Sequence, residues 1–174
     1  TSAKTGELFY DSTNRNFSYR FPNTTSAGAW RTGNSLNVAK QQMGQTGSQT
    51  SALAFGGEIA TAAAATTNEL YNGVSWTEVA DLNTGRGDLV GAGTATSALA
   101  NGGWTGSVSA LNESWNGTSW TEVADLNTAR QQASAGGESN TSAVIYAGYT
   151  ATARTGITET WNGTSFTEDG DMST

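Results

Sequence analysis

The chain lacks the two side chains that most often do chemistry in enzyme active sites. Among its 174 residues there is no histidine and no cysteine. Nucleophilic sites of the Ser–His–Asp or Cys–His kind need a histidine as the base, and zinc sites are mostly built from imidazole and thiolate ligands. The sequence therefore excludes these chemistries, and we expect no catalytic residue, no metal site and no cofactor.

Carboxylates are the remaining groups that could act as acids or bases. Glycoside hydrolysis, for example, needs two of them at a defined separation. Most acids of this chain recur at fixed positions of an internal repeat, namely Glu69, Glu113, Glu159, Glu78, Glu122, Glu168, Asp81, Asp125 and Asp171. A group repeated in every unit is more often structural than catalytic. The acids outside that pattern lie in no recognisable motif; they are Glu7, Asp11, Glu58, Asp88, Glu138 and Asp169. An enzyme is therefore not expected.

A cation also recurs, as Lys40, Arg86 and Arg130. Two interpretations are open. The cation could pair with a repeated acid, such as Asp81 or Asp125, and tie neighbouring units together. It could instead be a solvated surface charge, where an exposed ion pair contributes only about 0–1 kcal/mol. The tripeptide that starts at Arg86 also spells the integrin-binding sequence Arg-Gly-Asp, although the repeat already accounts for the arginine.

The aromatic residues fall into a repeated group and a group that breaks the repeat. The repeated positions are Trp30, Trp76, Trp120 and Phe166, and we predict that they pack between units. Trp104 follows a glycine pair at a place where the other units have Glu58 and Tyr149. An aromatic residue in a variable loop is a better contact candidate than a repeated one. Trp104 and Tyr149 are therefore the predicted ligand-binding residues.

Two landmarks that keep the same spacing establish the repeat. The segment 72–86 recurs as 116–130 and returns in degraded form as 162–174, so that Trp76, Trp120 and Phe166 are separated by 44 and 46 residues. The segment 51–57 matches 97–103 and 142–148 at the same interval. Segment 30–40 is a fourth, more divergent copy. A fixed period of this length is typical of repeat architectures.

Each unit is predicted to contain four short strands. A small-residue stretch such as 89–93 precedes an apolar run at 51–55, 97–100 or 142–146, which ends at Gly57, Gly103 or Gly148. After a variable connection, an Asn-Gly pair predicts a two-residue hairpin turn in which both central residues have positive φ. The alanine-rich stretch 59–66 favours a helix by propensity, but the aligned segments 105–110 and 150–157 are typical of loops. We therefore predict a connection there.

The double glycine after the second strand and the tryptophan in the fourth resemble the kelch repeat of β-propellers. This resemblance implies an all-β fold, a kelch-like β-propeller built from four-stranded repeats of about 45 residues. It implies three full units plus a partial N-terminal one. The amino-acid sequence of segment 113–130 also resembles, more specifically, repeats in structural and tail-associated proteins of bacteriophages.

The predicted organisation is a single domain in two parts. Segment 1–36 supplies a hairpin within 6–21 and a partial first blade, and segment 37–174 supplies three repeats at about 40–82, 86–126 and 130–172. Closed propellers typically need four to eight blades. Four units could close alone, two chains could share a ring, or the chain could be a piece of a longer protein.

Charge and hydropathy narrow the partners. The net charge is −7 and the eight basic residues are scattered, so no nucleic-acid partner is expected. No stretch approaches the roughly 20 apolar residues of a membrane helix, so no membrane insertion is expected.

We expect a non-enzymatic structural or receptor-binding domain of a phage virion, located on the virion surface or extracellular. Its expected partners are other copies of itself, virion proteins, or a host surface glycan or receptor. The alternative is a soluble carbohydrate-binding or protein-interaction module.

Overall fold

The computed structural model describes residues 8–11, 16–19, 33–60 and 64–172. The chain forms two compact units, Thr1–Thr32 and Gly33–Thr174. In the first unit, β1 (Leu8–Asp11) pairs antiparallel with β2 (Asn16–Tyr19), so that Leu8 lies opposite Tyr19. These strands lie within the segment for which a hairpin was predicted. The turn between them and the repeat residue Trp30 lie outside the described residues.

The second unit consists of three antiparallel four-stranded sheets, in each of which consecutive strands are neighbours. The first sheet contains β3 (Gly44–Ser48), β4 (Ser51–Phe55), β5 (Asn68–Tyr71) and β6 (Trp76–Val79). The second contains β7 (Val90–Thr94), β8 (Ser97–Trp104), β9 (Val108–Trp115) and β10 (Trp120–Val123). The third contains β11 (Ser134–Ser139), β12 (Ser142–Tyr146), β13 (Thr158–Trp161) and β14 (Phe166–Asp169). The described residues contain no helix, and the predicted all-β class is confirmed.

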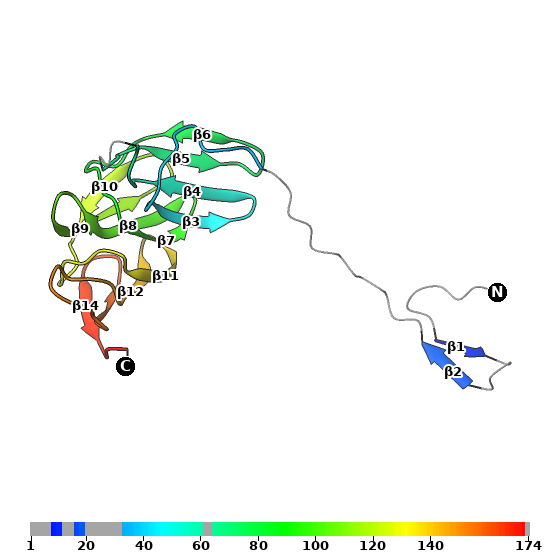
Figure 1. Cartoon of the computed structure of the whole chain (residues 1–174). Coiled ribbons are helices and arrows are strands. Elements are labelled where there is room, and N and C mark those ends of the chain that lie inside the picture. The colour runs from blue at the N-terminus through cyan, green and yellow to red at the C-terminus, as the bar shows by residue number, and fades with distance from the viewer. Residues whose placement is uncertain (1–7, 12–15, 20–32, 61–63, 173–174) are drawn as a thin grey trace. The chain divides into compact units, whose positions relative to one another are not determined.

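The first strands of the three sheets lie together. Strand β7 neighbours both β3 and β11, and Figure 1 shows the sheets following one another with these strands on the inside. Crowding explains their small residues: a Cβ at Gly91 would lie 2.8 Å from Cζ of Phe55. Four-stranded meanders arranged in this way are consistent with a β-propeller-like fold.

Two hydrophobic clusters hold the sheets together, one at each contact between neighbours. In the first cluster, Leu53 and Phe55 of β4 meet the second sheet, where Phe55 lies 4.9 Å from Trp120 between ring centroids. In the second cluster, Leu99 of β8 meets Ile145 of β12. Successive residues of a strand point to opposite faces, so each sheet contributes one face to each neighbour.

The connections differ in part from the sequence prediction. Residues 59–60 and 64–66 form no helix, as expected, and residues 61–63 lie outside the described part of the chain. Segment 105–110 was predicted to be a loop, but β8 extends to Trp104 and β9 begins at Val108. The connection in the second sheet is therefore only residues 105–107, because the longer strands pair almost to the turn.

The Asn-Gly hairpins form where they were expected, but the predicted two-residue turn is wrong. Tyr71 pairs with Trp76, so the loop contains four residues, 72–75. Only Gly73 among them has positive φ, at 92°. The Asn72 side chain accepts hydrogen bonds from the backbone N–H groups of Val74 and Ser75, both at 2.9 Å. Asn72 therefore stabilises the four-residue turn through its side-chain oxygen, and not by adopting the positive φ of a two-residue turn.

Candidate binding surface

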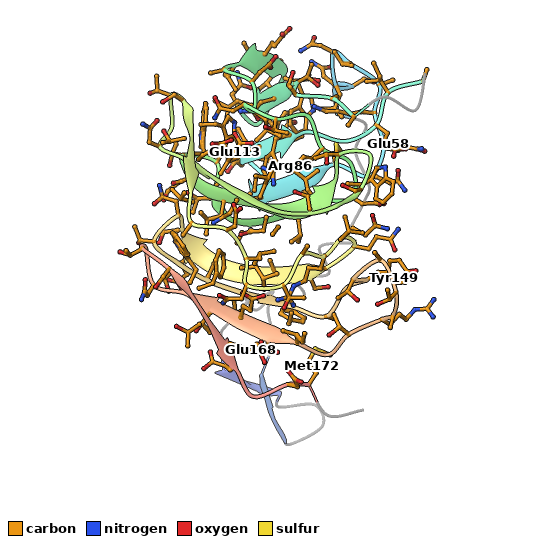
Figure 2. The ribbon with its side chains drawn as sticks, turned by 90° about the vertical axis from the view of Figure 1, so that its left-hand side faces the viewer. Glu58, Arg86, Glu113, Tyr149, Glu168 and Met172 are labelled. Carbon is orange, nitrogen blue, oxygen red and sulfur yellow. The ribbon has the colours of Figure 1, made fainter. Side chains whose placement is uncertain are left out.

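The repeated cation forms a buried ion pair in every sheet. The Arg86 guanidinium lies 3.0 Å from a carboxylate oxygen of Glu113, and these side chains are 0% and 1% exposed. Arg130 pairs in the same way with Glu159. Figure 2 shows Arg86 and Glu113 side by side inside the molecule. The prediction that the cation pairs with a repeated acid is confirmed, but the acid is the glutamate of β5, β9 or β13 and not Asp81 or Asp125. The alternative of a solvated cation is wrong.

The aspartates have a different, local role. An Oδ atom of Asp81 accepts the backbone N–H of Asn68 at 3.3 Å, and Asp125 accepts that of Asn112 at the same distance. These bonds hold the start of β5 and an equivalent point of β9 to the segments that follow β6 and β10. The aspartates therefore fasten the outer strands within a sheet.

Each buried glutamate also holds the segment that leads into its own sheet, which we call the linker. Glu113 accepts hydrogen bonds from the backbone N–H and the side-chain amide of Asn83, at 2.8 and 2.9 Å. The backbone N–H of Thr84 donates to the other oxygen at 3.4 Å. Glu69 and Glu159 make the equivalent bonds to Asn37 and Asn127. A fully bonded buried carboxylate avoids the desolvation cost of an unsatisfied one, and here it fixes the linker in place.

Burial changes the titration of the cations. It lowers the pKa of Lys40 below its ordinary value of 10.5, and the nearby Glu69 carboxylate opposes this shift. Burial likewise lowers the pKa of Arg86 below its ordinary value, against the effect of Glu113. Because Arg86 is fully buried, the Arg-Gly-Asp sequence that it begins does not present its guanidinium to a partner.

The linker in turn positions the residue that varies between units. Gly87, next to the buried Arg86, exchanges two backbone hydrogen bonds with Trp104, at 3.0 and 2.7 Å. Gln41 pairs with Glu58 and Gln131 with Tyr149 in the same manner. Trp104, Tyr149 and Glu58 therefore occupy one structural position, and we call these three residues the variable surface. Trp104 is the last residue of β8, and not a loop residue as predicted.

The glycine before each variable residue is required by this pairing. Gly57, Gly103 and Gly148 have φ of 97°, 108° and 110°. A Cβ at Gly103 would lie 2.6 Å from the carbonyl oxygen of Gly87, and one at Gly57 would lie 2.6 Å from that of Gln41. Only glycine fits such a close approach at positive φ. The residue before it tolerates a side chain, since Ala147 adopts a φ of 58°.

Glu58 and Trp104 both lie next to Gly87. A Cβ at Gly87 would lie 2.9 Å from Cγ of Glu58, and the backbone of Gly87 is bonded to that of Trp104. The first and second sheets therefore place the Glu58 side chain and the Trp104 backbone next to the same residue, Gly87. Glu58 also lines a hollow of about 480 Å³ together with Ala39, Lys40, Gln41, Ile59 and Ala60.

The members of the variable surface differ in accessibility. Trp104 is 37% exposed, more than any other aromatic side chain described in the unit Gly33–Thr174. Tyr149 is half-buried, and its hydroxyl donates to the carbonyl of Ala151 at 3.0 Å. Figure 2 shows Glu58 and Tyr149 on the same side of the molecule. An exposed indole that can still bury its face is a frequent contact residue in binding sites.

The repeated aromatic residues pack between sheets or on an end face. Trp120 and Phe166 are 6% and 8% exposed and belong to the two clusters. Trp76 is half-buried and lies 5.0 Å from Tyr71 between ring centroids. The predicted packing between units thus describes Trp120 and Phe166 but not Trp76, which belongs to the first sheet. The described residues contain no cluster of three or more metal-ligating side chains.

In the described part of the chain, no helix has the length and hydrophobicity to cross a membrane. No protein-family model matches the sequence, and no curated protein matches it.

Proposed function

We propose that this chain is a kelch-like β-propeller segment with a non-enzymatic role, a structural or receptor-binding domain displayed on a phage virion as part of a tail fibre or surface appendage. One observation supports the binding role above the others. The repeated cations and their partner glutamates form buried ion pairs, whereas the position that differs between sheets holds the exposed Trp104. A constant scaffold thus carries a changeable surface.

The chemistry of the variable surface favours a host glycan or receptor as the ligand. An indole gives a flat apolar face on which a sugar ring can stack, and a neighbouring carboxylate can accept hydrogen bonds from hydroxyl groups. Binding sites commonly combine apolar area with a few orienting polar groups. Trp104 and Glu58 supply these two kinds of group, and Tyr149 supplies a second aromatic residue at the equivalent place.

The virion assignment is supported by the resemblance of segment 113–130 to phage repeats, and the alternative by the variable surface alone. A soluble carbohydrate-binding or protein-interaction module would use the same Trp104 without any particle. Probing purified particles of the phage that encodes this chain with an antibody separates the two. Labelled particles support the virion domain, and unlabelled particles alongside retained ligand binding favour the soluble module.

Binding itself is tested on glycan arrays and on bacterial host cells with labelled protein. We expect Trp104→Ala to weaken binding at least tenfold, because it removes the exposed ring. The matched control is Val74→Ala, which truncates an apolar side chain that is 72% exposed at the tip of the β5–β6 hairpin. Equal binding by Trp104→Ala and the unmodified chain would exclude the variable surface as the ligand site.

A further inference from the structure

The two ends of the row of sheets expose the two halves of an interface that the chain builds twice internally. At each internal contact, one sheet contributes the face of its second strand that carries Leu53 and Phe55 in β4. The next sheet contributes the opposite face of its last two strands, where Trp115 and Trp120 lie in β9 and β10. We call the first the trailing face and the second the leading face.

The leading face of the first sheet has no neighbouring sheet among the described residues. It carries Tyr71 and Trp76, both half-buried, at the positions of Trp115 and Trp120, which are 1% and 6% exposed. A hollow of about 410 Å³ lies against Trp76. Its lining includes Met43, which aligns with Leu89 of the first internal cluster. This end therefore has the aromatic half of the interface without its partner.

The trailing face of the third sheet is the matching half. Val144 and Tyr146 are half-buried, although their counterparts Leu53 and Phe55 are completely buried. The difference is largest after the last strand. Met172 is 47% exposed, whereas the residues at its position in the other two sheets, Leu82 and Leu126, are 3% and 4% exposed. Figure 2 shows Met172 beyond the last sheet, at the far side from Arg86.

Backbone hydrogen bonds give this interface a direction. The N–H of Gly57 donates to the carbonyl of Arg86 in the next sheet's linker at 2.8 Å, and Gly103 donates to Arg130 at 2.9 Å. The equivalent N–H of Gly148 makes no backbone hydrogen bond to the described residues. The carbonyl of Lys40, the counterpart of Arg86 and Arg130, likewise accepts none from the described backbone.

A second series of bonds runs between the turns that precede the inner strands. Asp88 donates its N–H to the carbonyl of Gln42, and Gln132 donates to Asp88, each at 2.9 Å. All three residues have positive φ, between 52° and 53°. The series leaves a donor at Gln42 and an acceptor at Gln132. In the described part of the chain, each end therefore carries one free donor and one free acceptor, and head-to-tail continuation is the arrangement that extends both series of bonds.

We infer that a second copy of this chain docks the leading face of its first sheet on the trailing face of the third sheet. In this contact Gly148 donates to the Lys40 carbonyl of the second copy, and Met172 packs against Met43 and Trp76 of the second copy. The occupant follows from continuity, because the two faces are the halves of an interface already present twice in the chain. Two copies supply six described sheets, within the usual range of four to eight blades for a propeller.

This inference deepens the proposed function by assigning the self-assembly faces, and it depends on that function only for the closed propeller. It is tested by the molar mass of the full 174-residue chain in solution, measured by light scattering over a range of concentrations. We expect a defined multimer, twice the mass of one chain for a closed ring. Because mass does not depend on ligand binding, failure here and failure of the glycan test are distinguishable.

Two single variants and their mixture test the direction. Met172→Glu charges the trailing face and Trp76→Lys charges the leading face, and each is expected to remain at the mass of one chain, with the dissociation constant of the pair raised at least tenfold. Mixed in equal amounts, they should form a one-to-one pair, since one unmodified leading face and one unmodified trailing face remain. Val74→Glu, at the hairpin tip outside both faces, should assemble like the unmodified chain.

The outcomes are decisive in either direction. Circular dichroism first establishes that each variant is folded, and Met172→Glu is the safer one because its side chain is already exposed. A chain that stays at the mass of one molecule at every concentration overturns the inference, including the case in which residues 1–32 of the same chain cover a face. Assembly that survives Met172→Glu, or variants that do not complement each other in the mixture, overturns the assigned faces.

Discussion

The first and second sheets have different cations, Lys40 and Arg86, at the same buried position of the repeat. Arg86 donates to three backbone carbonyls, those of Gly102, Leu111 and Ala100, and also to Glu113. Lys40 donates to the carbonyls of Ala54 and Thr67, but its Nζ lies 3.9 Å from Glu69. Both cations are fully buried. The difference shows that the position demands a buried positive donor, while the planar fork of arginine alone satisfies the whole set of acceptors.

The largest effect on this comparison is expected from removing the carboxylate. Glu113→Ala leaves Arg86 charged and unpaired in the interior, because a guanidinium does not release its proton, and should cost about 3–5 kcal/mol. Glu69→Ala should cost less, because the already lowered pKa of Lys40 lets the amine become neutral. Urea unfolding of both variants measures the difference. Equal costs would mean that the identity of the cation is immaterial.

The next largest difference is expected between the stability costs of truncating Leu126 and Met172. Leu126→Ala empties a site that is 4% exposed in the second cluster, and should cost about 2–5 kcal/mol. Met172→Ala removes a side chain that is 47% exposed, and at concentrations where the chain is a single molecule should change stability by less than about 0.5 kcal/mol. Thermal unfolding at low protein concentration makes the measurement. A large loss for Met172→Ala under these conditions would show that a segment of the same chain covers it.

Replacing Lys40 by arginine should make the first sheet resemble the second. In the Lys40→Arg variant, the guanidinium should donate to Glu69 as Arg86 donates to Glu113, and the chain is expected to gain about 1 kcal/mol of stability at pH 7. The advantage should shrink as pH rises. The folded Lys40 has a lowered pKa, so between that value and 10.5 the unfolded chain binds a proton that the folded chain lacks. Between these two pKa values, the contribution of Lys40 to the free energy of unfolding of the unmodified chain therefore rises with pH.

Urea unfolding of the Lys40→Arg variant and the unmodified chain at pH 7, 9 and 10 tests the pH effect. Other titrating groups are shared by both proteins and cancel in the difference. An arginine advantage that stays constant or grows with pH would contradict the assignment of the titration to Lys40.

The smallest expected effect concerns the third glycine pair, where Ala147 stands at positive φ. Ala147→Gly relieves a left-handed conformation that costs a residue with a side chain about 1 kcal/mol, and the melting temperature should rise by a few degrees. Ala135→Gly, inside β11, is the control and should lower it, because glycine costs about 0.5–1 kcal/mol in a strand. A fall for both variants would mean that the entropy of the unfolded chain outweighs the strain.

The sequence predicted the repeated elements well because each landmark has a strong local cause. The apolar runs became β4, β8 and β12, and the glycines at 57, 103 and 148 adopt positive φ next to a closely packed carbonyl. A threefold repeat lets weak preferences reinforce one another. The alanine-rich stretch was assigned correctly, as far as it is described, only because its aligned counterparts did not favour a helix.

The candidate site was less predictable because its geometry depends on contacts across sheets. Asp81 and Glu69 both recur, and nothing in their spacing shows that only the glutamate faces Lys40; that follows from which side of β5 faces the linker. The same limit applies to Trp104 and Glu58. Their positions in the repeat are visible in the sequence, whereas the proximity of both residues to Gly87 results from the contact between neighbouring sheets.

The bonds from each glutamate to the preceding linker have a mechanical consequence for a protein held by its ends. Tension along the chain must pass through these carboxylate clamps one after another, and the three are not equally strong. The clamp at Glu69 relies on the more distant Lys40, so we expect the first sheet to yield at the lowest force. Single-molecule stretching should then show unfolding steps at unequal forces. In the Lys40→Arg variant, the separate step at the lowest force should disappear because the first sheet then resists as well as the others.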